Sequence, residues 1–132
     1  MAESFDSSLA RRRDAAMAYA NGDADPMRTI TALSGVATAF TRDGGFARGA
    51  RAVNEANLRQ AEDHAPEGGS TVLEIEDCGA QGDVGFWTGF QVSEVRLEGS
   101  DDRRADRLRV TEIYRRIGGE WQRVHCHASH GT

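Results

Sequence analysis

Residues 108–129 read LRVTEIYRRIGGEWQRVHCHAS, and this stretch decides the fold class. Two runs rich in β-branched and aromatic residues flank the dipeptide Gly118-Gly119. Such runs on either side of a glycine turn are typical of a β-hairpin. We therefore predict two long antiparallel strands over residues 105–117 and 120–130.

Two more strands are expected upstream of this hairpin. Residues 83–97 alternate with the strand period of two, which places Phe86 and Trp87 on opposite sides of one strand. Residues 71–77 show the same alternation, and residues 98–102 form a polar loop. The C-terminal half is therefore predicted to be a meander of antiparallel strands.

The N-terminal half is predicted to be mostly helical. Capping residues and Gly and Pro signals mark three helices, and short apolar runs mark two strands between the second and third helix. The expected helices cover about residues 6–21, 25–33 and 49–64, and the strands cover 36–41 and 46–48. Helices combined with an antiparallel meander indicate an α+β fold with the helices on one face of the sheet.

The composition excludes several classes of protein. The chain has 132 residues, of which 39% are hydrophobic and 28% charged, and this suits one globular domain over residues 1–132. The net charge is −5 and no basic stripe is present, so we expect no nucleic-acid partner. No apolar run reaches the roughly 18 residues of a membrane helix, so we expect no membrane partner.

The run Arg11-Arg12-Arg13 is the one basic cluster of the sequence. It falls in the first predicted helix, with Asp6 and Asp14 close by, and we interpret it as a solvated helix face rather than a phosphate-binding patch.

The cysteines and the N-terminal residues indicate in which cellular compartment the protein is expected. Cys78 and Cys126 fit free thiols in a reducing environment, and the acidic N-terminus has no hydrophobic leader. We therefore expect a cytoplasmic protein. The richness in Ala, Arg and Gly favours a bacterial source.

Two asparagines are unusual in the third predicted helix. Asn54 and Asn57 fall inside its apolar arc, and buried amides must find hydrogen-bond partners. They either tie down neighbouring backbone or a buried water, or they line a cavity that presents polar groups to a ligand.

Three segments resemble the nuclear transport factor 2-like superfamily, in particular its SnoaL-like and ketosteroid isomerase-like domains. They are AYANGD at residues 18–23, VATAF at 36–40 and GEWQRVHCHAS at 119–129. The Trp…Val-His-x-His ending is also similar to that of the association domain of calmodulin-dependent kinase II. The resemblance runs from about Leu9 to His130 and implies a cone-shaped fold, with three N-terminal helices packed on a curved antiparallel sheet.

The resemblance also implies a conical pocket between the concave face of the sheet and the helices. It further implies a homodimer that forms through the outer face of the sheet. The superfamily contains isomerases, cyclases, hydrolases and dehydratases, and also members with no chemistry. The fold therefore assigns no activity by itself.

Ketosteroid isomerase chemistry needs a carboxylate base and an oxyanion hole made of a tyrosine and a protonated aspartate. The resemblance would place the base at about Phe40 or Thr41, the aspartate near Thr111 and the tyrosine near Ala15. None of these residues has the required side chain, and Tyr19 lies one helical turn after Ala15. We therefore predict that ketosteroid isomerase-type catalytic residues are absent.

The histidine pair near the C-terminus allows several interpretations. His125 and His127 share one strand face, which we expect to include Trp121 and Arg123, while Cys126 takes the other face. The resemblance places Thr111, Cys126 and Ala128 toward the pocket and the two histidines toward a dimer partner. A metal site completed by His64 or His130 is the alternative, but no ligand stands at a recognised metal spacing, so we predict neither a metal nor a cofactor.

The remaining pocket candidates each have a structural alternative. Arg109 either binds a carboxylate or is solvated, Trp87 either packs under a helix or forms a cavity wall, and Cys126 is expected to be an inert buried thiol rather than a nucleophile. The predicted ligand-binding pocket consists of Tyr19, Phe40, Asn54, Asn57, Trp87, Arg109, Thr111 and Cys126.

These residues predict a SnoaL-like pocket domain without an evident catalytic set. Its ligand would be a small, largely apolar molecule with one polar or anionic end. Two alternatives remain open. One is an isomerase, cyclase or dehydratase that acts on a polyketide- or steroid-like substrate and uses His125 or His127 as its acid/base. The other is a homo-oligomeric assembly module.

Overall fold

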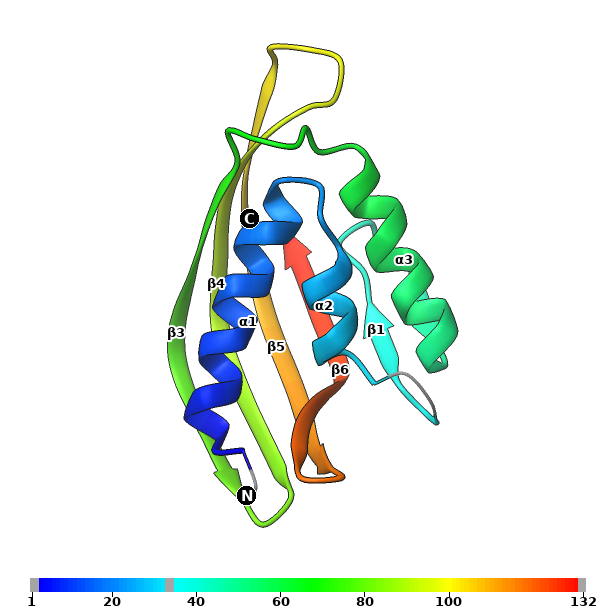
Figure 1. The fold of residues 1–132 in the computed structure, drawn as a ribbon, viewed down its shortest axis with the longest axis vertical. Coiled ribbons are helices and arrows are strands. Elements are labelled where there is room, and N and C mark those ends of the chain that lie inside the picture. The colour runs from blue at the N-terminus through cyan, green and yellow to red at the C-terminus, as the bar shows by residue number, and fades with distance from the viewer. Residues whose placement is uncertain (1–2, 33–34, 131–132) are drawn as a thin grey trace.

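A computed structural model describes residues 3–32 and 35–130 of the chain. Within these ranges it contains three helices and six strands in the α+β arrangement predicted from the sequence (Figure 1). The helices are α1 (Phe5–Ala20), α2 (Asp25–Ile30) and α3 (Ala50–Glu62). The strands are β1 (Thr38–Phe40), β2 (Phe46–Arg48), β3 (Ser70–Gln81), β4 (Val84–Arg96), β5 (Arg103–Ile117) and β6 (Glu120–His130). The end of the second predicted helix falls partly on residues 33 and 34, which lie outside the described residues.

The six strands form one sheet in the order β2-β1-β6-β5-β4-β3. The expectation of a purely antiparallel sheet was wrong at one pair. The short strand β1 adds to the free edge of β6 in the parallel direction, with Thr38 opposite His125 and Phe40 opposite His127. The parallel pair of β1 and β6 makes the sheet mixed. The sequence pattern marks each strand, but it does not indicate the direction in which a short strand pairs with its neighbour.

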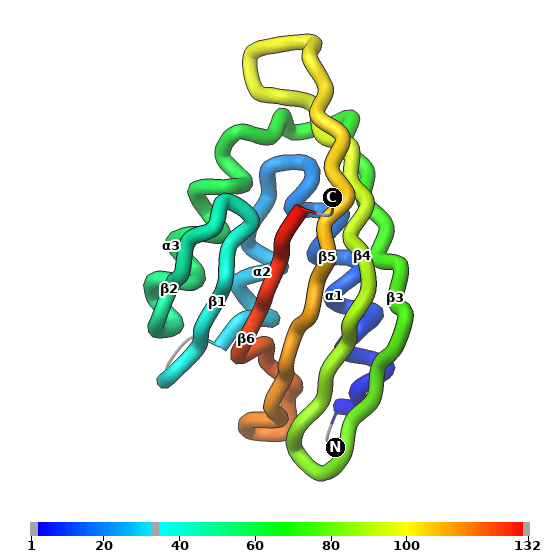
Figure 2. Tube along the Cα trace, turned by 180° about the vertical axis from the view of Figure 1, so that it is seen from behind, coloured from blue at the N-terminus to red at the C-terminus, as the bar shows by residue number. Residues whose placement is uncertain are grey.

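The helices cover one face of the sheet and leave the other face bare. Figures 1 and 2 show this arrangement from opposite sides, with the helices in front of the sheet in the first view and behind it in the second. Among the described helices, none is long and apolar enough to cross a membrane.

The main core lies between α1 and the central strands. Phe5 and Leu9 of α1 pack with Trp87 of β4, Tyr114 of β5 and Trp121 of β6. Phe5 meets Tyr114 and Trp121 in edge-to-face geometry, with ring centroids 5.6 and 5.1 Å apart. Burial of an apolar side chain of this size contributes about 2 kcal/mol, so this contact fixes the helix on the sheet.

A β-bulge in β6 determines which side chains enter the interior. Ile113 pairs with His125 whereas Tyr114 pairs with Arg123, so Val124 is an extra residue on β6. One extra residue reverses the alternation of side chains along a strand. Arg123 and Cys126 therefore both point toward the helices, although they are three residues apart. The prediction that Trp121 and Arg123 share a face with the two histidines was wrong for this reason.

Candidate ligand-binding cavity

A cavity lies between the helices and the inner face of the sheet. It encloses about 690 Å³ of unoccupied space, counting its open mouth. Much of the wall is apolar and includes Ala16, Met27, Ala39, Leu108, Val110 and Ala128. The polar groups that reach it come from every layer of the fold and are Arg12, Tyr19, Arg42, Asn57, Gln60, Gln91 and Arg123.

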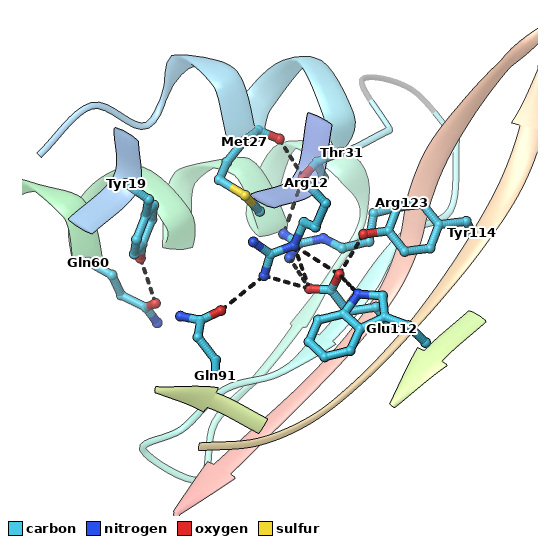
Figure 3. Close-up of polar contacts among 10 residues, drawn as sticks. Arg12, Tyr19, Met27, Thr31, Gln60, Gln91, Glu112, Tyr114 and Arg123 are labelled. Atoms are coloured by element: carbon cyan, nitrogen blue, oxygen red, sulfur yellow. Dashed lines mark hydrogen bonds and ion pairs between the residues drawn. The ribbon is translucent and has the colours of Figure 1, made fainter. Parts of the chain in front are cut away.

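A buried carboxylate lies behind the cavity wall, where it is bonded to the lining residues Arg12 and Arg123. Glu112 is fully buried and accepts hydrogen bonds from Arg12 Nε at 3.0 Å, Arg123 Nη1 at 2.8 Å and the indole N–H of Trp87 at 2.6 Å. Arg12 Nη2 donates to it as well, at 3.0 Å, and so does the hydroxyl of Tyr114, at 2.5 Å (Figure 3). Burial opposes ionisation of Glu112, but the charges of Arg12 and Arg123 outweigh it and hold its pKa well below the ordinary value.

The charges of this cluster do not cancel. Glu112 supplies one negative charge, whereas Arg12 and Arg123 are each only 4% exposed and supply two positive charges. Arg12 also donates from Nη2 to Gln91 Oε1 at 3.1 Å, but its Nη1 makes no hydrogen bond with the described residues. An unpaired buried charge is costly, and a guanidinium is a forked donor suited to a carboxylate. This end of the cavity is therefore complementary to an anion.

Neutral polar groups line the opposite wall. The hydroxyl of Tyr19 donates to Gln60 Oε1 of α3 at 2.8 Å, and burial raises the pKa of Tyr19 to about 12. One helical turn before Gln60, the Nδ2 atom of Asn57 is buried and has no hydrogen-bond partner among the described residues. The wall thus presents donors that a ligand oxygen could satisfy.

The thiol of Cys126 borders the same space but is not activated. Burial raises its pKa to about 11, although the nearby charge of Arg123 acts in the opposite direction. A cysteine with a raised pKa stays protonated at neutral pH and is a poor nucleophile.

The structure brings four of the eight predicted pocket residues to the cavity. Tyr19, Asn57 and Cys126 line it directly. Phe40 borders it at the edge of the sheet, but its ring packs against His125 and His127, with centroids 5.5 and 5.3 Å away.

Two of the other predicted pocket residues tie the fold together instead. Asn54 donates from Nδ2 to the backbone carbonyls of Ala32 and Ala50 at 3.2 and 2.9 Å. Trp87 is completely buried beneath α1 and donates to Glu112. Both residues therefore follow the packing interpretation that the sequence left open.

Thr111 and Arg109 were predicted on the pocket side, and this was wrong. Thr111 pairs with His127 and Arg109 pairs with Ser129, and residues directly opposite each other in a sheet share a face. Both side chains therefore lie on the outer face. Glu112, which pairs with Cys126, is the inward residue of β5 at this level.

The two histidines also lie on the outer face. His125 Nδ1 is 2.7 Å from the hydroxyl of Thr38, and partial burial together with His127 and Arg123 lowers the pKa of His125. Neither imidazole lines the cavity, so an inward acid/base role for His125 or His127 was a wrong prediction. In the part of the chain that the structure describes, no three His, Cys, Asp or Glu side chains come together in a possible metal site.

Sequence reasoning missed the central residues of the site, which are Arg12, Gln60, Gln91, Glu112 and Arg123. Two signals were available. Arg12 lies three residues after Leu9 and four before Ala16, which places it on the apolar face of α1. Glu112 alternates with Val110 and Tyr114, which marks an inward carboxylate.

The fold was compared with known proteins. No family model matches the chain, and no curated protein matches it. Among solved structures, a protein of the nuclear transport factor 2-like family from Streptomyces avermitilis is 15% identical, with a TM-score of 0.75 over 94% of this chain and 91% of its own. A nuclear transport factor 2-like superfamily protein from Salmonella enterica is 12% identical, with a TM-score of 0.76 over 95% and 87% of the two chains.

The CaMKII hub of S. rosetta is also similar. It is 21% identical, with a TM-score of 0.69 over 93% of each chain. At these identities the likeness concerns the fold, and it agrees with the three helices packed on one face of a six-stranded sheet. The chain has the nuclear transport factor 2-like fold.

Proposed function

We propose that this protein binds a small, largely apolar molecule that ends in a carboxylate or a similar monoanion. The anionic end lies against Arg12, and the apolar body lies along Met27, Leu108 and Val110. The observation that carries this proposal is the net positive charge of the buried cluster around Glu112, with Arg12 Nη1 left without a partner among the described residues.

The titration states of the groups near the cavity favour binding over catalysis. Glu112 is ionised, but its oxygens already accept hydrogen bonds from four residues, so it is poorly placed to take a proton from a substrate. Tyr19 and Cys126 have raised pKa values of about 12 and about 11 and keep their protons at neutral pH. These groups can position a ligand through hydrogen bonds.

Calorimetric titration with octanoate and octanamide tests this proposal, because the two molecules share an apolar chain and differ in charge. We expect octanoate to bind at least about tenfold more tightly than octanamide, since a hydrogen bond to a charged group is stronger than a neutral one. Arg12→Met should remove this preference, whereas Arg109→Met on the outer face should leave it unchanged. Equal binding of both molecules to the wild-type protein would refute an anion site.

A second proposal concerns assembly. The outer face of the sheet exposes Phe40, Phe46, Phe86 and Ile113. One row of paired residues across this face runs Thr38, His125, Ile113 and Phe86, and Arg48 of β2 continues it beyond Thr38. Exposed apolar surface of this kind marks protein–protein contacts, so we propose that two copies associate through this face.

Analytical ultracentrifugation of the wild-type protein and of Ile113→Glu tests the dimer. A carboxylate in the middle of the contact should weaken association by at least about 100-fold. Leu58→Glu is the matched control, because Leu58 is exposed on α3, on the helical side of the molecule. A dimer that survives in Ile113→Glu, or a wild-type monomer, would exclude this contact.

A further inference from the structure

A second, more polar chamber adjoins the ligand-binding cavity. It contains about 440 Å³ of unoccupied space, counting its opening. The two spaces share part of their walls, including Ala16, Tyr19, Gln60 and Leu108. The polar side chains that border the second chamber are Arg42, His64, Thr71, Ser93, Arg104 and Asp106.

Two buried donor atoms that border this chamber have no hydrogen-bond partner among residues 3–32 and 35–130. They are the hydroxyl Oγ1 of Thr71 and the Nε of Arg104. Arg104 Nε lies 3.4 Å from Asp106 Oδ2, which is close enough for an ion pair but does not meet hydrogen-bond geometry. Buried polar atoms without partners are uncommon, and these two border the same space.

The protonation state of His64 contributes to the net charge of the chamber. The Nδ1 atom is 2.8 Å from the carbonyl oxygen of Tyr19, and Nε2 is 3.2 Å from Arg104 Nη2. A carbonyl can only accept and a guanidinium can only donate, so Nδ1 carries the proton and Nε2 is the acceptor. Burial lowers the pKa of His64, and the charges of Arg104 and Arg42 add to this effect, so the ring is neutral.

The ion pairs of this chamber leave one positive charge in excess. Asp106 is the carboxylate that borders it, and this residue is bonded by Arg42 at 2.8 Å and paired with Arg104. With His64 neutral, two guanidinium groups face one carboxylate. The second chamber therefore has the same number of charges of each sign as the cluster around Glu112, although the side chains of Arg42 and Arg104 are 25% and 34% exposed.

We infer that the second chamber binds a second anionic group of the ligand, so that the ligand is a linear molecule with a carboxylate at each end. This inference rests on the proposed function, because the first carboxylate is the one that Arg12 binds. The second carboxylate accepts hydrogen bonds from the Thr71 hydroxyl and from Arg104, while the apolar wall shared by the two spaces covers the chain between the ends.

The spacing of two backbone positions on β4 sets the approximate scale of the molecule. Gln91, which contacts Arg12, and Val95, which pairs with Arg104, are four residues apart on β4. Four residues of extended strand span about 13 Å. A dicarboxylate of about ten carbons is matched to this separation, whereas a six-carbon dicarboxylate is too short.

The test compares decanoate with decanedioate by calorimetric titration at pH 8. An added charge weakens binding to an apolar pocket, so a preference for the dicarboxylate requires a partner at the far end. We expect decanedioate to bind at least about tenfold more tightly than decanoate, and more tightly than hexanedioate. Arg104→Met and the isosteric Thr71→Val should each reduce the tenfold preference without changing the affinity for decanoate. Arg107→Met, on the outer face, should have no effect.

The outcomes separate the two proposals. If decanoate binds through Arg12 but decanedioate binds no more tightly, the second site is refuted and the proposed function stands. A preference that persists in both Arg104→Met and Thr71→Val also refutes the second site. If neither molecule binds to the wild-type protein, the proposed function fails and this inference falls with it.

Discussion

At the level of Glu112 and Ile113 on β5, the face that meets the helices buries an ionic cluster, whereas the outer face exposes an aliphatic side chain. The inner face buries Glu112 and Arg123, and the outer face exposes Ile113 beside the imidazoles of His125 and His127. Proteins usually have the opposite distribution. Interior charge costs stability unless it is paired, and exposed apolar surface favours association. The two faces are therefore suited to different partners, a small anion inside and another protein surface outside.

The largest expected effect comes from Glu112→Gln on the inner face. The substitution keeps the shape of the side chain but leaves Arg12 and Arg123 buried without a counter-charge. Loss of one partner from a buried ionic group costs about 3–5 kcal/mol in the free energy of unfolding. Urea unfolding followed by circular dichroism measures this cost.

The neighbouring residue on the outer face is the control for this comparison. Thr111→Val should change the free energy of unfolding by no more than about 0.5 kcal/mol, because Thr111 is exposed on the outer face. A loss below about 1 kcal/mol in Glu112→Gln would mean that the inner cluster is not a tightly coupled unit.

The dependence of stability on pH sharpens the same comparison. The pKa of Glu112 is depressed in the folded protein, because Arg12 and Arg123 outweigh the opposing effect of burial. Its contribution is therefore fully present above the pKa of the unfolded chain and is lost as the pH falls through the folded pKa. The stability difference between wild type and Glu112→Gln should be constant from about pH 6 to 8 and should shrink below about pH 4. Urea midpoints at pH 7, 4 and 3 give this difference, and a gap of constant size would show that Glu112 is not the titrating group.

The sequence predicted the elements well because their signals are local. The hairpin from β5 to β6 was placed from the strand period of two and from Gly118-Gly119, and β6 begins and ends where expected. The three helices were predicted from capping signals and apolar spacing, and their ends differ by only a few residues.

The prediction of which side chains of β5 and β6 face the helices was less accurate, and in β6 the cause is one extra residue. The extra residue Val124 shifts the register of β6, so that Arg123 and Cys126 both face inward while the histidines face outward. No composition or turn signal marks this bulge. Thr111 was placed inward from the family resemblance alone, and its pairing with His127 puts it on the outer face.

The charged cluster was missed because charged side chains were expected to lie in contact with solvent. Arg12 belongs to a run of three arginines, and only its spacing relative to Leu9 and Ala16 separates it from its neighbours. Its partner Glu112 is 100 residues away in the sequence. A pairing over that distance cannot be predicted from one sequence, because it depends on how α1 crosses the sheet.

The two thiols compare the interior with the surface directly, without any change to the stability of the fold. Cys78 is exposed on β3, whereas Cys126 lines the cavity and has a pKa raised to about 11 by burial. A thiol reagent such as dithionitrobenzoate should modify Cys78 at least about 100-fold faster than Cys126, because the thiolate is the reactive form and the buried thiol must first become accessible.

Octanoate should slow the reaction of Cys126 further and leave the reaction of Cys78 unchanged, since only Cys126 borders the proposed ligand. Cys78→Ser isolates the slow reaction. If Cys126 reacts as fast as Cys78, the cavity is open to the reagent, and if octanoate does not protect it, the ligand lies elsewhere.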